Sequence, residues 1–148
     1  MPTIVAATEP AQSLLIIGTD DKKEHKSYKF NGSSNGPASI TFGNGTEAVD
    51  SCSVTWNNEQ YVFGGQTNKR QISKIENCEL TQIGELDFDF SSGACAATNE
   101  HIVLCFGNDD DTKICRYGDD PLDITKTLPE SYFGHRYTRI AAGQGKID

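Results

Sequence analysis

The chain has 148 residues, of which 36% are hydrophobic and 23% charged, and its formal net charge is −8. A chain of this length usually forms one domain, and its apolar content is too high for a disordered chain. The negative charge argues against a nucleic acid or an anionic membrane surface as a partner, because both are bound through Lys and Arg. No segment approaches the ~20 apolar residues of a membrane span. Residues 1–10 also lack the basic and apolar regions of a signal peptide.

Strand patterns dominate the chain from its beginning. Two short apolar runs lie at residues 3–8 and 13–18, and the turn-rich segment 31–39 separates them from the rest of the chain. Four strands with β-branched, aromatic or alternating apolar residues are predicted next, at 51–56, 60–63, 71–75 and 78–83. Four more are predicted at 93–98, 101–106, 112–117 and 124–128, with a hairpin turn at 108–111. No long segment has the 3.6-residue apolar period of a helix, so almost no helix is expected.

Two parts of the chain repeat each other. Residues 50–65, and residues 92–107 some 42 positions later, share a small-residue start, an apolar run, a polar turn, a second apolar run and a glycine. A further start follows at residues 137–142. A period in the forties is typical of stacked or radial repeat architectures. We therefore predict one repeat region over 1–148, with approximate units 3–49, 50–91 and 92–136 and the start of another at 137–148.

The second of these units resembles a kelch repeat. Its strand Tyr61–Phe63 ends in the double glycine Gly64–Gly65, which is diagnostic of that family, and Leu80 stands where the family has a later large apolar residue. The match is weaker in the third unit, where Phe106–Gly107 replaces the double glycine, and weakest in the first, where Ile17–Gly18 stands there. The tryptophan that the family places late in each repeat is missing throughout.

This resemblance implies an all-β fold, an antiparallel β-propeller built from kelch-type blades. Propellers need roughly 4–8 blades to close, and this chain supplies two complete units and parts of two others. We therefore expect an incomplete propeller, which is either a fragment of a larger protein or a chain that completes the ring by self-association. An open array would leave unpaired strand edges, which are an aggregation hazard. No cofactor is expected.

The five cysteines suggest disulfide bonds. Cys105 and Cys115 are equidistant from Asp110 in the predicted turn, so they should lie opposite each other on neighbouring strands. Cys78 ends one unit and Cys95 begins the next, so a second disulfide could join neighbouring blades. The alternative is that all five are buried thiols of a reduced protein.

The remaining cysteine and two glycosylation motifs bear on location. Cys52 occupies the repeat position of Cys95 and has no cysteine partner near Asn31, so it would be a free thiol or pair outside this sequence. A zinc site is disfavoured because there is no C-x-x-C pair. The sequons Asn31-Gly-Ser33 and Asn44-Gly-Thr46 could be used only in a secreted chain. Together with the cysteines they favour an extracellular protein.

Candidates for catalysis or metal binding are few. Asp109–Asp111 could offer carboxylates to calcium, but consecutive residues on a tight turn rarely converge on one ion. Asp87 and Asp89 share one side of an extended segment, so they are not placed across a glycosidic bond. The three histidines have no serine or cysteine nucleophile in a recognisable motif. No metal site and no enzymatic activity are therefore expected.

The leading hypothesis is a non-catalytic module that binds a protein, or a glycan, through the loops of its blades. The segments expected at the binding face are 87–92 and 131–136. Their aromatic, basic and histidine side chains resemble an anchor set for recognition: Phe88, Phe90, Tyr132, Phe133, His135 and Arg136. The alternative for the aromatics is that they fill the gap between blades.

Two other functions remain open. The chain could be a fragment of a propeller enzyme, such as a secreted oxidase or glycosidase, with its catalytic residues in missing blades. It could also be an intracellular kelch adaptor, against which the five cysteines argue.

Overall fold

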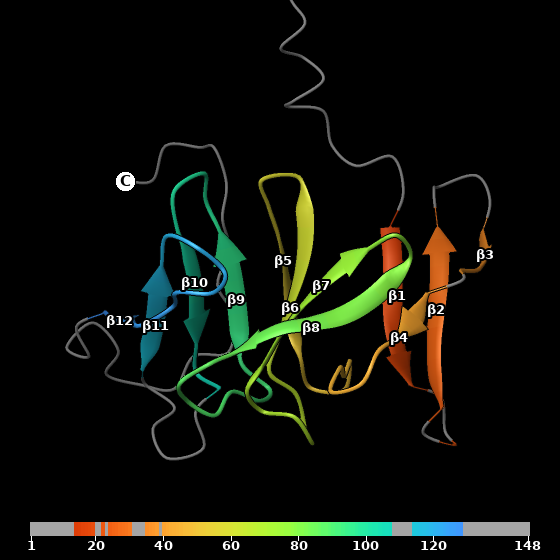
Figure 1. Ribbon diagram of the computed structural model, residues 1–148, viewed down its shortest axis with the longest axis horizontal. Helices are drawn as coiled ribbons and strands as arrows, with labels where there is room; N and C mark the ends of the chain where they lie inside the picture. Colours follow the sequence, from red (N-terminus) through yellow and green to blue (C-terminus); the bar gives the residue numbers. More distant parts are fainter. Residues whose placement is uncertain are drawn as a thin grey trace, which may run out of the picture. The chain divides into compact units, whose positions relative to one another are not determined.

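The computed structural model describes residues 14–19, 22, 24–30, 35–38, 40–107 and 114–128. Every regular element in these ranges is a β-strand, and the strands form three sheets (Figure 1). The described residues contain no helix that could cross a membrane. The expectation of an all-β and mostly antiparallel fold is therefore confirmed. The chain divides into two compact units, Met1–Ile40 and Thr41–Asp148.

The first unit contains a three-stranded antiparallel sheet. Its strands β1 (Leu14–Thr19), β2 (His25–Phe30) and β3 (Asn35–Pro37) follow each other in both sequence and space. Ser27 extends the pairing beyond β3, because its hydroxyl donates to the Ala38 carbonyl at 2.7 Å. Several large apolar side chains of this sheet stay exposed: Leu15, Ile16, Tyr28 and Phe30.

The second unit begins with a five-stranded sheet in the order β4-β8-β7-β6-β5. Its antiparallel part consists of four consecutive strands: β5 (Cys52–Trp56), β6 (Glu59–Phe63), β7 (Gln71–Glu76) and β8 (Glu79–Glu85). The short strand β4 (Thr41–Phe42) adds to the outer edge, parallel to β8. These four strands lie where the sequence predicts them, to within two residues at each end.

Two tight turns at one end of this sheet explain its register. Asn57 and Asn58 join β5 to β6 with φ of 49° and 63°, and Asn77 and Cys78 join β7 to β8 with φ of 51° and 60°. Two residues with positive φ are typical of the hairpin turn that matches strand twist, and Asn is favoured there. Cys78 therefore lies in a turn, and the prediction that it begins a strand is wrong, since β8 begins at Glu79.

The last sheet has four antiparallel strands in the order β12-β11-β10-β9. The strands are β9 (Ala94–Ala97), β10 (Ile102–Cys105), β11 (Cys115–Gly118) and β12 (Lys126–Thr127). The predicted turn at 108–111 lies outside the described residues. The strand predicted over 124–128 is shorter than expected, because the preceding residues form a turn in which the Asp123 N–H donates to the Asp120 carbonyl.

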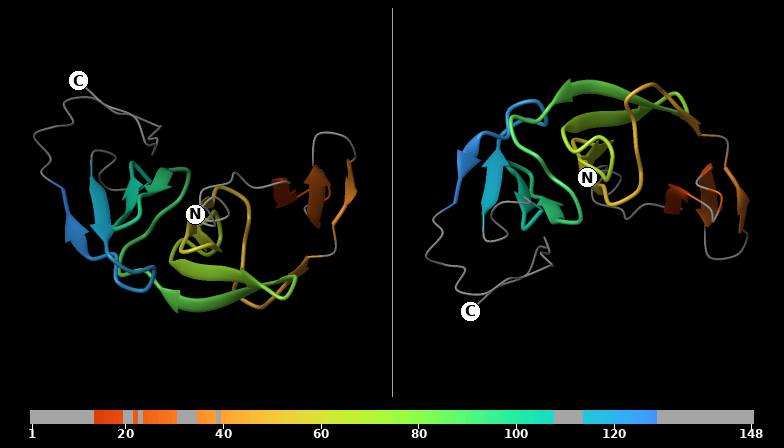
Figure 2. Two further views of the ribbon diagram at one scale, coloured as in Figure 1. Left: turned by 90° about the horizontal axis from the view of Figure 1, so that it is seen from above. Right: turned by 90° about the horizontal axis from the view of Figure 1, so that it is seen from below.

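The core of the second unit lies between its two sheets. Their first strands, β5 and β9, run beside each other (Figure 2). Apolar residues from both sheets and from the connection between them form one buried cluster: Val54, Tyr61, Phe63, Ile72, Leu86, Phe88, Phe90, Ile102, Leu104 and Ile124. Trp56 packs against this cluster.

The turn after β11 reaches across to the five-stranded sheet. A Cβ atom at Gly84 would lie 2.7 Å from the tip of the exposed Leu122 side chain, so the turn and the sheet are in close contact here. Gly84 stands beside a register shift between β7 and β8, at Ile72 and Ser73. Such a bulge bends a strand locally.

The backbone follows the 42-residue interval of the sequence. Asp50 and Ser92 have φ of 59° and 57°, while Gly64 and Phe106 have φ of 67° and 68°. The second pair includes a bulky residue, for which the left-handed region is a genuine outlier. The Ser92 N–H also donates to the Asp50 carbonyl at 2.9 Å, which joins one equivalent position to the other.

Candidate functional site

Three loops gather at one end of the two larger sheets. They connect β4 to β5, β6 to β7, and β8 to β9, and we name residues 43–51, 64–70 and 86–93 together the loop rim. Backbone hydrogen bonds join all three, since the Gln66 N–H donates to the Val49 carbonyl and the Gly65 N–H donates to the Phe90 carbonyl. The loop rim is therefore a continuous hydrogen-bonded structure rather than three independent loops.

The aromatic residues of the loop rim are core residues. Phe88 and Phe90 are 6% and 1% exposed, and their rings meet edge to face with centroids 6.3 Å apart. The Arg116 guanidinium lies over the Phe88 ring, 4.8 Å from its centroid. The prediction that these two aromatics are exposed binding anchors is therefore wrong. The hydrophobic effect favours filling the space between the sheets, which is the alternative that the sequence left open.

The double glycine is required by the packing of Phe90. Gly64 and Gly65 have φ of 67° and 149°, in the region that favours glycine. A Cβ atom at Gly64 would clash with the Phe90 carbonyl oxygen and would stand 2.8 Å from the Phe90 ring. At Gly65 it would lie 2.6 Å from a carboxylate oxygen of Glu47. These glycines let three segments of the loop rim approach each other.

Glu47 caps the loop that comes after the double glycine. It is 7% exposed, and one carboxylate oxygen accepts the N–H groups of Thr67 at 2.7 Å and Asn68 at 2.8 Å. Hydrogen bonds from backbone amides to a carboxylate are among the stronger ones in proteins. The side-chain amide of Asn68 also donates to the Gly45 carbonyl. The first and second loops of the rim are thus locked together.

Gln71 completes this buried polar network. Its side chain is fully buried; the amide nitrogen donates to the carbonyls of Glu47 and Gly64, and the amide oxygen accepts the Glu47 N–H and the Ser73 hydroxyl. All the hydrogen-bonding capacity of the amide is used, as a buried polar group requires. Neither Glu47 nor Gln71 was predicted from the sequence. The one available signal was the placement of Gln71 and Ser73 at alternate positions of a predicted strand, which puts both on the same face.

The exposed part of the loop rim is polar and carries charges of both signs. Its exposed side chains include Asn44, Asp50, Gln66, Thr67, Arg70, Asp87 and Ser92. The Arg70 Nε atom donates to the Asp89 carboxylate at 2.8 Å, and this hydrogen bond raises the pKa of the Arg70 guanidinium. Since both partners are about half exposed, the ion pair orients the loop more than it stabilises the fold.

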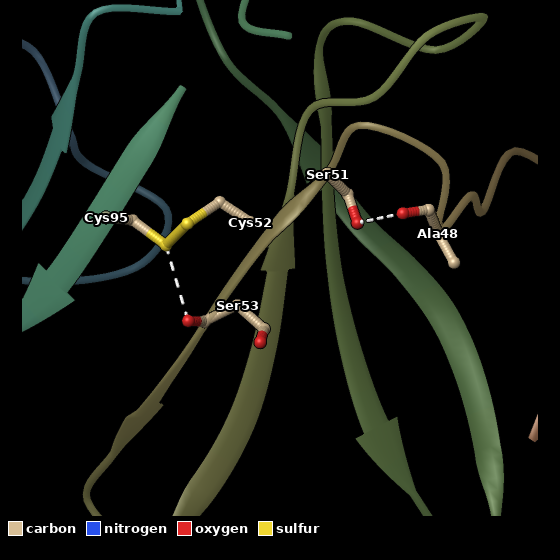
Figure 3. The surroundings of a disulfide bond; sticks show 5 residues. All are labelled: Ala48, Ser51, Cys52, Ser53 and Cys95. Atoms are coloured by element: carbon tan, nitrogen blue, oxygen red, sulfur yellow. Dashed lines mark hydrogen bonds between the residues drawn. A yellow bond between two sulfur atoms is a disulfide. The ribbon is translucent and has the colours of Figure 1, made fainter. Parts of the chain in front are cut away.

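A disulfide lies immediately beneath the loop rim. Cys52 of β5 and Cys95 of β9 are bonded, with their Cα atoms 6.0 Å apart (Figure 3). The adjoining Ser51 hydroxyl donates to the Ala48 carbonyl at 2.8 Å. The Cys95 Sγ atom lies 3.3 Å from the Ser53 carbonyl oxygen, but a disulfide sulfur carries no proton, so this contact is packing.

The cysteine pairing differs from one of the two predictions. Cys105 and Cys115 form a disulfide between β10 and β11, as their spacing predicts. The predicted bond between Cys78 and Cys95 is wrong. The first strands of successive sheets lie side by side, so Cys95 meets Cys52, while Cys78 stands exposed in the turn between β7 and β8 with a free thiol.

A second polar cluster lies at the opposite end of the five-stranded sheet. Lys74 contacts the carboxylates of Glu59 at 2.9 Å and Glu76 at 3.6 Å, and the Tyr61 hydroxyl donates to Glu59 at 2.8 Å. The hydrogen bond from Lys74 lowers the pKa of the Glu59 carboxyl and raises that of Lys74. Burial, followed by the bond to Glu59, raises the pKa of Tyr61. The groups satisfy one another, which indicates a structural ion pair.

Other predicted site residues have different outcomes. Asn44 is exposed in a turn. Several others lie outside the described residues: Asn31, Tyr132, Phe133, His135 and Arg136. The same is true of Asp109–Asp111, so the calcium alternative stays open. Among the residues that the structure describes, no group of three His, Cys, Asp or Glu side chains could hold a metal ion.

No protein-family model matches this chain, and no curated protein sequence matches it significantly.

Proposed function

We propose that this chain is a non-catalytic binding module, part of an extracellular protein, in which kelch-like blades of an incomplete propeller present the loop rim to a protein partner. The observation that carries the proposal is how the loop rim is built. Glu47, Gln71 and the double glycine fix its backbone, while the side chains of Gln66 and Asp87 are exposed. Recognition loops are commonly exposed segments positioned by a rigid scaffold.

The blade interpretation has its own support. Two meanders of four strands begin at adjacent first strands, and their left-handed residues recur at the same interval of 42 residues. A radial array of blades would require such a repeat of backbone geometry. Analogy between folds does not identify a partner, however, so the binding surface is argued from the exposed residues alone.

The extracellular part of the proposal rests on the two disulfides. Disulfides persist in oxidising compartments and are rare in the cytosol. The two disulfides are compatible with an extracellular location, and the one between Cys52 and Cys95 links the two sheets whose loops form the rim. An intracellular adaptor would have to keep these sheets together without it.

Because Phe88 and Phe90 lie in the core, the residues proposed to contact the protein partner are the exposed Gln66, Arg70 and Asp87. This surface is small and hydrophilic, and it includes the ion pair between Arg70 and Asp89. Charged pairs of this kind contribute specificity and association rate more than affinity. A protein partner with complementary charges fits this surface better than an apolar ligand.

The test is a binding screen of the disulfide-intact chain, displayed as a tetramer, against arrayed secreted and cell-surface ectodomains. Hits are re-measured by surface plasmon resonance with the loop-rim variants Asp87→Arg and Gln66→Arg and with Glu100→Arg at the opposite end as the matched control. We expect the loop-rim variants to weaken binding at least about tenfold, or 1.4 kcal/mol, and the control to leave it unchanged. Hits that are insensitive to both loop-rim variants would contradict the proposal. Binding confined to a glycan array would replace the protein partner with a carbohydrate.

A further inference from the structure

We infer that Asn44 is an N-glycan acceptor, placed at the outer edge of the five-stranded sheet. This inference rests on the extracellular part of the proposed function, because N-glycans are added in the secretory pathway. The motif is Asn44-Gly45-Thr46, which satisfies the requirement for Ser or Thr two residues after Asn and excludes proline between them. What distinguishes it from a chance triplet is the local structure.

Asn44 occupies the first central position of a tight turn. The Thr46 N–H donates to the Gly43 carbonyl at 3.2 Å, which closes the turn, and Gly45 follows Asn44 with φ of 80°. This is the pattern of a type II turn, whose second central residue must be glycine or asparagine. The first central position tolerates many residues, and at Asn44 it carries an exposed side chain.

The residues next to Asn44 are needed for the conformation of the turn, whereas the side chain of Asn44 is not. Gly45 is required by its positive φ and by the approach of the Gln82 side chain. The Thr46 hydroxyl donates to the Gly43 carbonyl at 2.6 Å. The turn's hydrogen bonds thus use Gly43 and Thr46 and do not require asparagine at position 44. Its amide is free to project into solvent, as an attached glycan must.

The position also has space for a glycan. The turn directly follows β4, whose pairing with β8 ends where the Gly43 N–H donates to the Leu80 carbonyl at 2.8 Å. Beyond that point, Thr81, Ile83 and Glu85 of β8 are exposed at the edge of the sheet. A glycan on Asn44 would stand beside this edge, where bulk hinders pairing with a strand of another chain.

The reaction that attaches the glycan needs only the acceptor motif and a donor. The Asn44 Nδ2 atom forms a bond to the anomeric carbon of the first sugar of a lipid-pyrophosphate-linked oligosaccharide. The bond between that carbon and the pyrophosphate oxygen breaks, the lipid pyrophosphate leaves, and the amide loses one proton. No oxidant or reductant is involved.

The test expresses the full chain in mammalian cells behind an appended secretion signal. Glycosylation at each site is read by peptide mass spectrometry after enzymatic deglycosylation in heavy-oxygen water, which converts an occupied Asn to a labelled Asp. A sample treated in the same way without the enzyme gives the label that arises from spontaneous deamidation at Asn-Gly, which is subtracted. Both the secreted and the cell-retained protein are read, because glycans are added before folding is complete. We expect the label at position 44 in most molecules. An Asn44→Gln variant should lose it while keeping the cooperative unfolding of the wild type.

An unlabelled Asn44 in both fractions would overturn the inference, even if the chain is secreted with its disulfides formed. A gel shift that persists in Asn44→Gln and disappears in Asn31→Gln would overturn it as well, because the glycan would then be at the other sequon. Neither result depends on partner binding, so a failure here is distinct from a failure of the loop-rim screen. Thr46→Ser, which keeps an acceptor hydroxyl, should remain glycosylated.

Discussion

Replacing Gly64 with alanine should destabilise the second unit by about 3 kcal/mol. Residues with a Cβ atom pay roughly 1–2 kcal/mol in the left-handed region, where Gly64 has φ of 67°. The new methyl group would also clash with the Phe90 carbonyl oxygen and crowd its ring. Forcing an atom into a packed site typically costs about 1–3 kcal/mol. The sum of the two terms gives the expected magnitude.

Urea unfolding followed by tryptophan fluorescence measures this effect. The chain has a single tryptophan, Trp56, and it packs against the core between the two sheets, so its emission reports the second unit. With a slope of about 2 kcal/mol per molar urea, the Gly64→Ala midpoint should fall by about 1.5 M. A control in the first unit is Gly18→Ala, where a Cβ atom meets nothing within 4 Å, and the Trp56 midpoint should not change. A Gly64→Ala midpoint within about 0.3 M of wild type would refute the argument from Phe90 packing.

Three further outcomes are expected from the same unfolding assay. Glu47→Ala should cost about 2–3 kcal/mol, because it leaves the partly buried N–H groups of Thr67 and Asn68 without an acceptor. Glu47→Gln should cost less because its amide oxygen can still accept, and equal losses would argue against the capping role. Replacing Cys52 and Cys95 together with alanine opens a loop with a sequence separation of 43 and should cost up to about 4 kcal/mol, whereas an unchanged midpoint would show that the two sheets hold together without the bond. Lys74 lowers the pKa of Glu59, so the ion pair between them stabilises the fold. This contribution is fully present at pH values above the usual glutamate pKa of 4.5 and is lost as the pH falls through the lowered pKa. Glu59→Gln should flatten this part of the acid unfolding curve, and an unaltered curve would count against the ion pair.

The strands were largely predictable because their signal is local. Alternation of apolar residues and Asn-rich turns place β5, β6 and β7 within a residue or two of the observed bounds. The start of β8 was misplaced because Cys78 occupies a left-handed turn position, where cysteine is uncommon. A left-handed turn position cannot be predicted from the residue type alone when that residue is a cysteine.

The loop rim was less predictable because its contacts are long-range. Gln71 and Glu47 are 24 residues apart, and neither residue type suggests burial by itself. Phe88 and Phe90 lie in a polar segment of the sequence, so they resemble exposed anchor residues. In the structure they are buried between the two sheets. The pairing of Cys52 with Cys95 depends on β5 lying beside β9, a relation between repeats that the spacing of cysteines does not contain.

The bond between Cys52 and Cys95 has a consequence for how the chain would respond to tension. A force applied to the two ends of the second unit would pass from β5 to β9 directly through the sulfur atoms. Strands β6, β7 and β8 lie within the enclosed loop, whose sequence separation is 43, so they would carry none of that load. About 150 Å of extended chain would stay hidden until the disulfide is reduced. Reduction of this bond would thus lengthen the module under force, which single-molecule pulling would record as an additional step of about that length.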